Sequence, residues 1–165
     1  MITMISDLRV PRTHLFFFCP LFHHSILSLA TRYDKKMPMS DRSKDWLAQA
    51  EKDLDQAKSS QAEGRHEWAC FAAQQSAEKA VKALHLFRGQ EAWGHVVAKL
   101  LEELALEIPE TLIDKAKVLD NFYVPTRYAN GHPDGAPFEH YGKLQSEDAI
   151  CYASEILEFV RNKMA

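Results

Sequence analysis

Apolar residues recur with a helical period from residue 43 to the end of the chain. In residues 43–64 four of them follow one another at steps of three or four, and Gly64 stands at the end of the pattern. These four positions are Leu47, Ala50, Leu54 and Ala57. Side chains at this spacing share one face of a helix, so residues 43–64 are predicted to form an amphipathic helix.

Residues 66–89 repeat this period with small side chains, and Gly89 closes the pattern. The resulting stripe consists of Ala69, Ala72, Ala73, Ser76, Ala77, Ala80 and Ala83. Small side chains let a neighbouring helix backbone approach closely. Because the stripe is longer than one neighbour within the chain requires, we expect it to contribute to a homodimer interface.

Four polar residues lie midway along this second helix, namely Gln74, Gln75, Glu78 and Lys79. Lys79 is a candidate nucleotide- or RNA-binding residue because its ammonium group can pair with phosphate. The alternative interpretation is that all four side chains belong to a solvated face of the helix.

Three further segments show the same period. Residues 95–105 predict a short helix, a fourth helix begins at Pro109 and is stopped by Pro125, and a fifth begins near Ser146. No segment alternates with the period of a strand. The sequence therefore predicts an all-α protein, an antiparallel up-and-down bundle of four to five helices.

The first 36 residues differ from the rest. Their apolar run, THLFFFCPLFHHSILSLA, is interrupted by Pro20 and by His23 and His24. We expect residues 1–36 to be a non-native or disordered extension upstream of a start at Met37 or Met39, and residues 37–165 to form a single domain. The alternatives are a poor signal peptide and a genuine extension.

Charge and cysteine content restrict the function further. Residues 1–36 hold five of the 20 basic and two of the 23 acidic residues, so residues 37–165 carry 15 against 21, a net charge of −6. This sign excludes a protein that grips polyphosphate over a broad surface. The three cysteines form no CxxC pair, and no Cys/His ligand spacing occurs, so we expect a cytoplasmic protein without a metal site or cofactor. No apolar run approaches the length of a membrane span.

The segment from Asn121 to Gly142, NFYVPTRYANGHPDGAPFEHYG, is the exception to the helical pattern. It holds three of the seven prolines and three of the six glycines, together with Arg127 and His132. Loops this long are uncommon in compact helical proteins and tend to be functional or disordered.

Three pieces of the sequence carry a family resemblance: DWLAQAEKDL, WACFAAQQSAEKAVKAL, and YVPTRY followed by a loop that ends in PFEHYG. Together they resemble the HEPN domain, named for higher eukaryotes and prokaryotes nucleotide-binding, over about residues 41–163. The resemblance implies a helical bundle that usually dimerises. Many members of the family are metal-independent endoribonucleases of toxin–antitoxin or defence systems. Others bind nucleotides or pair with a small nucleotidyltransferase encoded nearby.

The catalytic members of this family carry an arginine, four to six residues, and then a histidine. Arg127 and His132 fit this pattern. The pairs Arg9/His14 and Arg88/His95 also fit the bare spacing, so the position directly after the fourth helix is what favours Arg127.

Metal-independent RNA cleavage requires a base for the 2′-hydroxyl and a cation for the phosphate charge. Histidine is the type of side chain that titrates near neutral pH, so His132 suits the first task, whereas the planar guanidinium of Arg127 suits the second. Tyr128, Asn130 and Tyr141 are candidates to stack on or hydrogen-bond a base.

Structural roles are possible for the same residues. Arg127 would cap the last carbonyls of the fourth helix or pair with an acid, and His132 would lie exposed in a turn. The loop tyrosines would pin the loop to the bundle, and His95 would cap the third helix or lie at the core edge. The sequence thus leaves two functions open: RNA cleavage through Arg127 and His132, or a non-catalytic nucleotide-binding module that works with a nucleotidyltransferase.

Overall fold

The computed structural model describes residues 42–165, which belong to one compact unit. The prediction for residues 1–36 lies outside the described residues. The helices are α2 (Ser43–Ala62), α3 (His66–Phe87), α4 (Val97–Glu102), α5 (Glu110–Asp120), α6 (Pro137–His140) and α7 (Lys143–Met164). A short 3-10 turn, η1, spans Ala129–Gly131, and no strand occurs between residues 42 and 165. The all-α prediction is confirmed.

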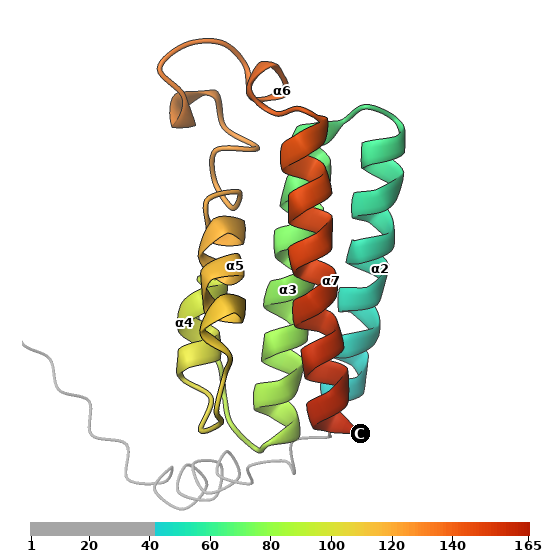
Figure 1. The fold of residues 1–165 in the computed structure, drawn as a ribbon, viewed down its shortest axis with the longest axis vertical. Coiled ribbons are helices and arrows are strands. Elements are labelled where there is room, and N and C mark those ends of the chain that lie inside the picture. Colours follow the sequence, from blue (N-terminus) through green and yellow to red (C-terminus); the bar gives the residue numbers. More distant parts are fainter. Residues whose placement is uncertain (1–41) are drawn as a thin grey trace, which may run out of the picture. The chain divides into compact units, whose positions relative to one another are not determined.

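The helices run alternately up and down (Figure 1). The long helices α2, α3 and α7 pack against one another, and the shorter α4 and α5 together fill the fourth position of the bundle. The segment between α5 and α7, orange in Figure 1, lies at the same end as the α2–α3 connection. Two hydrogen bonds of 3.0 Å join that connection to α7, since both Gln61 and His66 contact the hydroxyl of Ser146.

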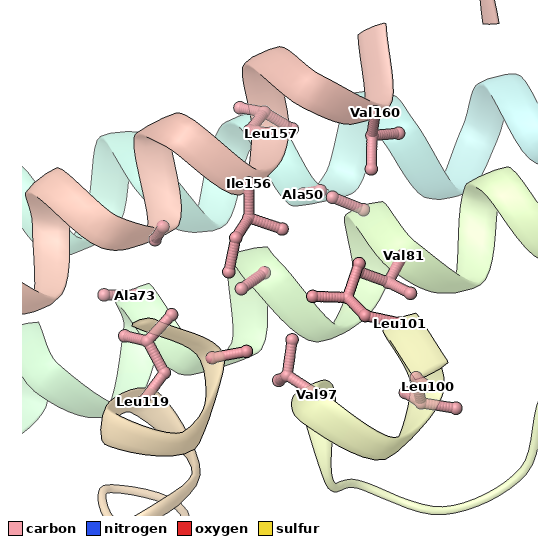
Figure 2. Packing of buried hydrophobic residues seen from close by; sticks show 14 of the residues in the cluster. Ala50, Ala73, Val81, Val97, Leu100, Leu101, Leu119, Ile156, Leu157 and Val160 are labelled. Atoms are coloured by element: carbon pink, nitrogen blue, oxygen red, sulfur yellow. The ribbon is translucent and has the colours of Figure 1, made fainter. Parts of the chain in front are cut away.

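The apolar stripes predicted from the sequence form the core. Figure 2 shows Ile156 of α7 and Leu119 of α5 both pointing toward α3, the helix that carries Ala73. Ala73, Leu119 and Ile156 are fully buried. The core is therefore built mainly of alanine on α3 and larger aliphatic side chains on the helices around it.

The alanine stripe of α3 is buried inside the bundle. Ala69, Ala73, Ala77, Ala80 and Ala83 are all 0% exposed, because α3 contacts α2, α4, α5, α6 and α7. The premise that one intramolecular neighbour would leave part of the stripe free is wrong. These alanine side chains are therefore not accessible to a second copy of the chain.

Helix ends differ from the prediction by a few residues. Pro109 is the N-cap of α5 rather than its first helical residue, and α5 ends at Asp120. Between Asp120 and Pro125 the chain continues in turns. These turns are closed by backbone hydrogen bonds to the residue three positions earlier, such as that from Phe122 N–H to Leu119 O at 2.9 Å. The helix α7 begins at Lys143, three residues before Ser146. Within residues 42–165, no helix is long and apolar enough to cross a membrane.

Candidate functional site

Arg127 is held in place by its own segment. Its Nε and Nη2 donate hydrogen bonds of 2.9 and 2.6 Å to the carbonyl oxygen of Tyr123. The preceding turn is fixed by Thr126, whose hydroxyl donates to Phe122 O at 2.6 Å. A guanidinium has five N–H donors, so these two bonds leave three for a ligand. Arg127 thus caps a backbone carbonyl, which is one of the structural roles considered for it. This role occupies only two of its five N–H donors.

Three aromatic rings surround this guanidinium. Its Cζ lies 4.3 Å from the ring centre of Phe71, 4.8 Å from that of Tyr123 and 5.2 Å from that of Tyr128. Cation–π attraction holds the planar group against these faces. Arg127 is consequently a rigid, half-buried donor rather than a mobile surface residue.

A pocket of about 390 Å³ opens between α2 and α3 beside this arginine. Phe71 lines it together with Trp68, which meets Phe71 edge-on at 6.0 Å, and with Lys79. Lys79 is half-buried and ion-paired with Asp53, which also lines the pocket. Phe71 is therefore shared by the pocket and by the ring contacts of Arg127.

His132 lies in a different contact network. Its Nε2 is 2.9 Å from the carbonyl oxygen of Pro125, and its ring stacks on His140 at a centre-to-centre distance of 4.0 Å. The edge of Tyr141 completes this group at 5.8 Å. In the described part of the chain, no hydrogen bond or ring contact joins His132 to Arg127. The exposed-turn interpretation of His132 is wrong, because the ring is half-buried and bonded.

The loop around the two stacked histidines is ordered by local bonds. His140 Nε2 is 2.7 Å from Asp134 O, and the carboxylate of Glu139 accepts a 2.8 Å bond from the backbone N–H of Ala136. Gly135 makes this turn possible, since its φ is +72° and an added Cβ would come within 2.6 Å of Glu139 Oε2. The loop is thus folded onto its own backbone.

The other three candidate base-binding residues are dispersed. Tyr128 is 52% exposed beside Arg127, so one aromatic surface is open to a ligand there. Asn130 is exposed in η1. Tyr141 packs edge-on against Phe122 and the core, and burial raises the pKa of its hydroxyl. Its position matches the structural role of pinning the loop.

A buried polar cluster on α3 was not predicted. Glu78 is only 4% exposed, and Gln74 is fully buried, so the solvated-face interpretation is wrong for both. Glu78 accepts bonds from Lys82 at 2.8 Å and from the amide of Gln74 at 3.3 Å. Burial by itself would raise the pKa of Glu78, but the bond and charge of Lys82, together with bonds from His95 and Gln74, lower it.

His95 belongs to this cluster. Its Nδ1 lies 3.1 and 3.3 Å from the two carboxylate oxygens of Glu78, and its ring stacks on Tyr123 at 4.7 Å. It does not cap α4, because the carboxylate of Asp120 accepts the backbone N–H groups of Val97 and Ala98 at 2.6 and 3.1 Å. Burial raises the pKa of Asp120 despite these two bonds. The only sequence signal for the cluster was a Glu/Lys pair four residues apart, which is common on solvated helices.

No group of three or more His, Cys, Asp or Glu side chains suited to a metal ion occurs in the part of the chain that the structure describes.

Comparison with protein-family models gives one decisive match, because the model of the HEPN domain aligns with residues 43–163. The chain belongs to the HEPN family. The match spans α2 to α6 and all but the last residue of α7, and it includes the segment that carries Arg127. A search of curated protein sequences finds no match.

Three solved structures resemble this HEPN domain. TT1696 from Thermus thermophilus is 50% identical over 74% of this chain and 98% of its own, with a TM-score of 0.73. ST0689, an archaeal HEPN homologue, is 38% identical over 75% and 98%, with a TM-score of 0.66. An HEPN domain protein from Thermotoga maritima is 38% identical over 71% and 94%, with a TM-score of 0.58.

Proposed function

We propose that this HEPN domain binds the phosphate of RNA or of a nucleotide at Arg127. The observation that carries the proposal is the geometry of the guanidinium, which is fixed by Tyr123 and three aromatic rings while three of its N–H donors stay free for a ligand. Planar donors of this kind fit phosphate oxygens in pairs. The open face of Tyr128 and the pocket at Trp68 supply surfaces on which a base can stack.

If the bound RNA is also cleaved, the protein is a metal-independent endoribonuclease of a toxin–antitoxin or defence type. Arg127 would stabilise the charge of the phosphate in the transition state, and an imidazole would take the proton of the 2′-hydroxyl. By spacing alone, His132 is the candidate for that imidazole. The structure supports catalysis to the extent that Arg127 is pre-positioned before any substrate arrives.

The second candidate function is a non-catalytic nucleotide-binding module that works with a small nucleotidyltransferase encoded nearby. Two observations favour it. Residues 37–165 carry 15 basic against 21 acidic residues, which weakens binding to long RNA. In addition, Nε2 of His132 is engaged with the carbonyl of Pro125.

Replacing Arg127 by Ala is expected to weaken binding of a fluorescein-labelled single-stranded RNA by about 10- to 100-fold, because charge-assisted bonds to phosphate are lost. Arg127→Lys should recover little of this, since an ammonium cannot form the paired bonds. Fluorescence anisotropy measures both affinities, with ATP titrated in a parallel arm as a mononucleotide.

The matched control for this experiment is Arg161→Ala. Arg161 is an exposed arginine of the last turn of α7, ion-paired with Glu51 at 2.7 Å, at the end of the helix opposite the loop. Its removal should leave both affinities unchanged. Equal affinities for the wild type and Arg127→Ala would refute the proposal.

A homodimer remains part of this proposal, but the side chains that form it are now expected elsewhere. Trp93 is 81% exposed and lines a pocket of about 500 Å³ with Trp46 and Leu86. We expect Trp93→Ser to shift the protein from dimer to monomer in light scattering at tens of micromolar, with Phe138→Ser, at a residue that is 64% exposed, as the control. A wild-type monomer would contradict this. The cytoplasmic location stays a prediction.

A further inference from the structure

Among the described residues, His95 combines an imidazole open to solvent with a buried carboxylate behind it. The side chain of His95 is 55% exposed, whereas that of Glu78 is 6% exposed. A carboxylate accepts hydrogen bonds and donates none, so the ring nitrogen that faces it, Nδ1, carries the proton. In the neutral ring the lone pair is then on Nε2, which makes no hydrogen bond to any described residue.

We infer that His95 is the acid–base group of the Arg127 site and that Glu78 positions the imidazole of His95. This inference rests on the proposed RNA-binding function. The assignment follows from contacts with one ring. His95 stacks on Tyr123 with an interplanar angle of 15°, and the guanidinium of Arg127 lies 4.8 Å from the centre of the same ring. A single aromatic ring therefore links the imidazole to the phosphate-binding group.

Glu78 does more than tie down the α3–α4 connection. The backbone of His95 is already held by the amide of Gln74, which donates to His95 O at 3.1 Å. The charge of Glu78 is balanced by Lys82 at 2.8 Å without any help from the imidazole. The bond that Nδ1–H donates to Glu78 thus adds what those contacts do not supply, a fixed tautomer and a counter-charge for an imidazolium.

His132 is the weaker choice for the same task. Its Nε2 is 2.9 Å from Pro125 O, a carbonyl that only accepts, so this nitrogen carries the proton and Nδ1 is the nitrogen left to accept one. One of its ring faces is covered by His140. These contacts give His132 a part in folding the loop, and none of them reaches the rings around Arg127.

The chemical step balances without a metal or a further reagent. The lone pair of His95 Nε2 accepts the proton of a ribose 2′-hydroxyl, and the 2′-oxygen forms a bond to phosphorus. The bond from phosphorus to the 5′-oxygen breaks, and its electron pair leaves with that oxygen, which takes a proton from water. The products are a 2′,3′-cyclic phosphate and a 5′-hydroxyl, and the imidazolium returns its proton to the hydroxide that remains.

The test uses the full chain in the presence of EDTA, with a labelled single-stranded RNA and the same RNA fully methylated at its 2′-oxygens. The first reports cleavage and the second reports affinity alone. His95→Asn keeps a donor for Glu78 but cannot accept the proton. We expect it to lower the cleavage rate by about 10²- to 10⁴-fold and to leave the affinity for methylated RNA unchanged.

Two further variants separate catalysis from folding. Free imidazole added to His95→Ala should restore part of the cleavage rate, a rescue that a purely structural role would not show. Glu78→Gln should lower kcat with KM unchanged, because it acts through His95. The matched control is His66→Asn, whose imidazole is bonded to Ser146 at 3.0 Å, and it should keep full activity.

The outcomes distinguish this inference from the function on which it rests. Absence of binding to methylated RNA by the wild type would refute both. Binding that depends on Arg127, combined with no cleavage by the wild type, would overturn the inference alone. Full cleavage by His95→Asn, or a loss that follows His132→Asn instead, would do the same.

Discussion

Replacing Ile156 by Ala is expected to lower the free energy of unfolding by about 2–5 kcal/mol. Ile156 is 0% exposed, and it points from α7 into the centre of the bundle (Figure 2). The loss has two parts, the transfer free energy of the deleted methyl and methylene groups and the cavity that they leave. Because α3 contributes mainly alanine side chains to this core, the neighbours have few atoms with which to fill the space.

Urea unfolding followed by circular dichroism measures this effect. Ile156→Val removes less volume and should lower the free energy of unfolding by about 0.5–1.5 kcal/mol. The two variants together show whether the loss grows with the volume removed. Leu144→Ala on the same helix is the control, since Leu144 is 70% exposed and its deletion leaves no cavity. A loss for Ile156→Ala no larger than that for Leu144→Ala would show that α7 is not packed as described.

The helical framework could be predicted because local signals agree with tertiary packing. Gly64 and Gly89 end α2 and α3 with φ values of +75° and +71°, as their places after the last apolar positions indicated. The end of α5 was missed for a physical reason: the bonding pattern tightens at Asn121, and Phe122 keeps the chain buried as it turns. Turns of this kind retain the apolar period after the helix has ended.

The site was predictable in part. The motif pointed to Arg127, and its hydrogen bonds and ring contacts fit the ligand-binding role proposed for it. The contact between Glu78 and His95 was not predicted, since it depends on the path of the chain between α3 and α4, a tertiary feature that no spacing encodes. The alanine stripe was misread for a similar reason, because its length reflects several neighbouring helices rather than a second copy of the chain.

The buried cluster at Glu78 leads to the second large effect on stability. Lys82→Met keeps the apolar stem of the side chain but removes the charge that lies 2.8 Å from Glu78. The side chains of this pair are only 13% and 6% exposed. Removing one partner of a buried pair typically costs about 3–5 kcal/mol, and we expect a loss at pH 7 near the lower end because Gln74 and His95 still contact the carboxylate.

The pH dependence of this loss follows from the direction of the pKa shift. In the wild type the pKa of Glu78 lies below its ordinary value of 4.5, so the ionised group stabilises the fold above that pH, and this stabilisation is lost as the pH falls through the lowered pKa. Without Lys82, burial dominates and the pKa of Glu78 rises. Protonation of Glu78 then removes the unpaired buried charge from the variant. The difference in unfolding free energy between the variant and the wild type should therefore shrink as the pH is lowered from 7 toward 4.

Urea unfolding of both proteins across this pH range measures the deficit directly. The matched control is Lys143→Met, which breaks an ion pair with Glu147 at the same helical spacing, 3.5 Å apart, in which the side chains are 76% and 50% exposed. Solvent screens an exposed pair, so its removal should not change stability measurably at any pH. A deficit for Lys82→Met that stays constant between pH 7 and 4 would mean that lost packing, rather than the stranded carboxylate of Glu78, accounts for the effect.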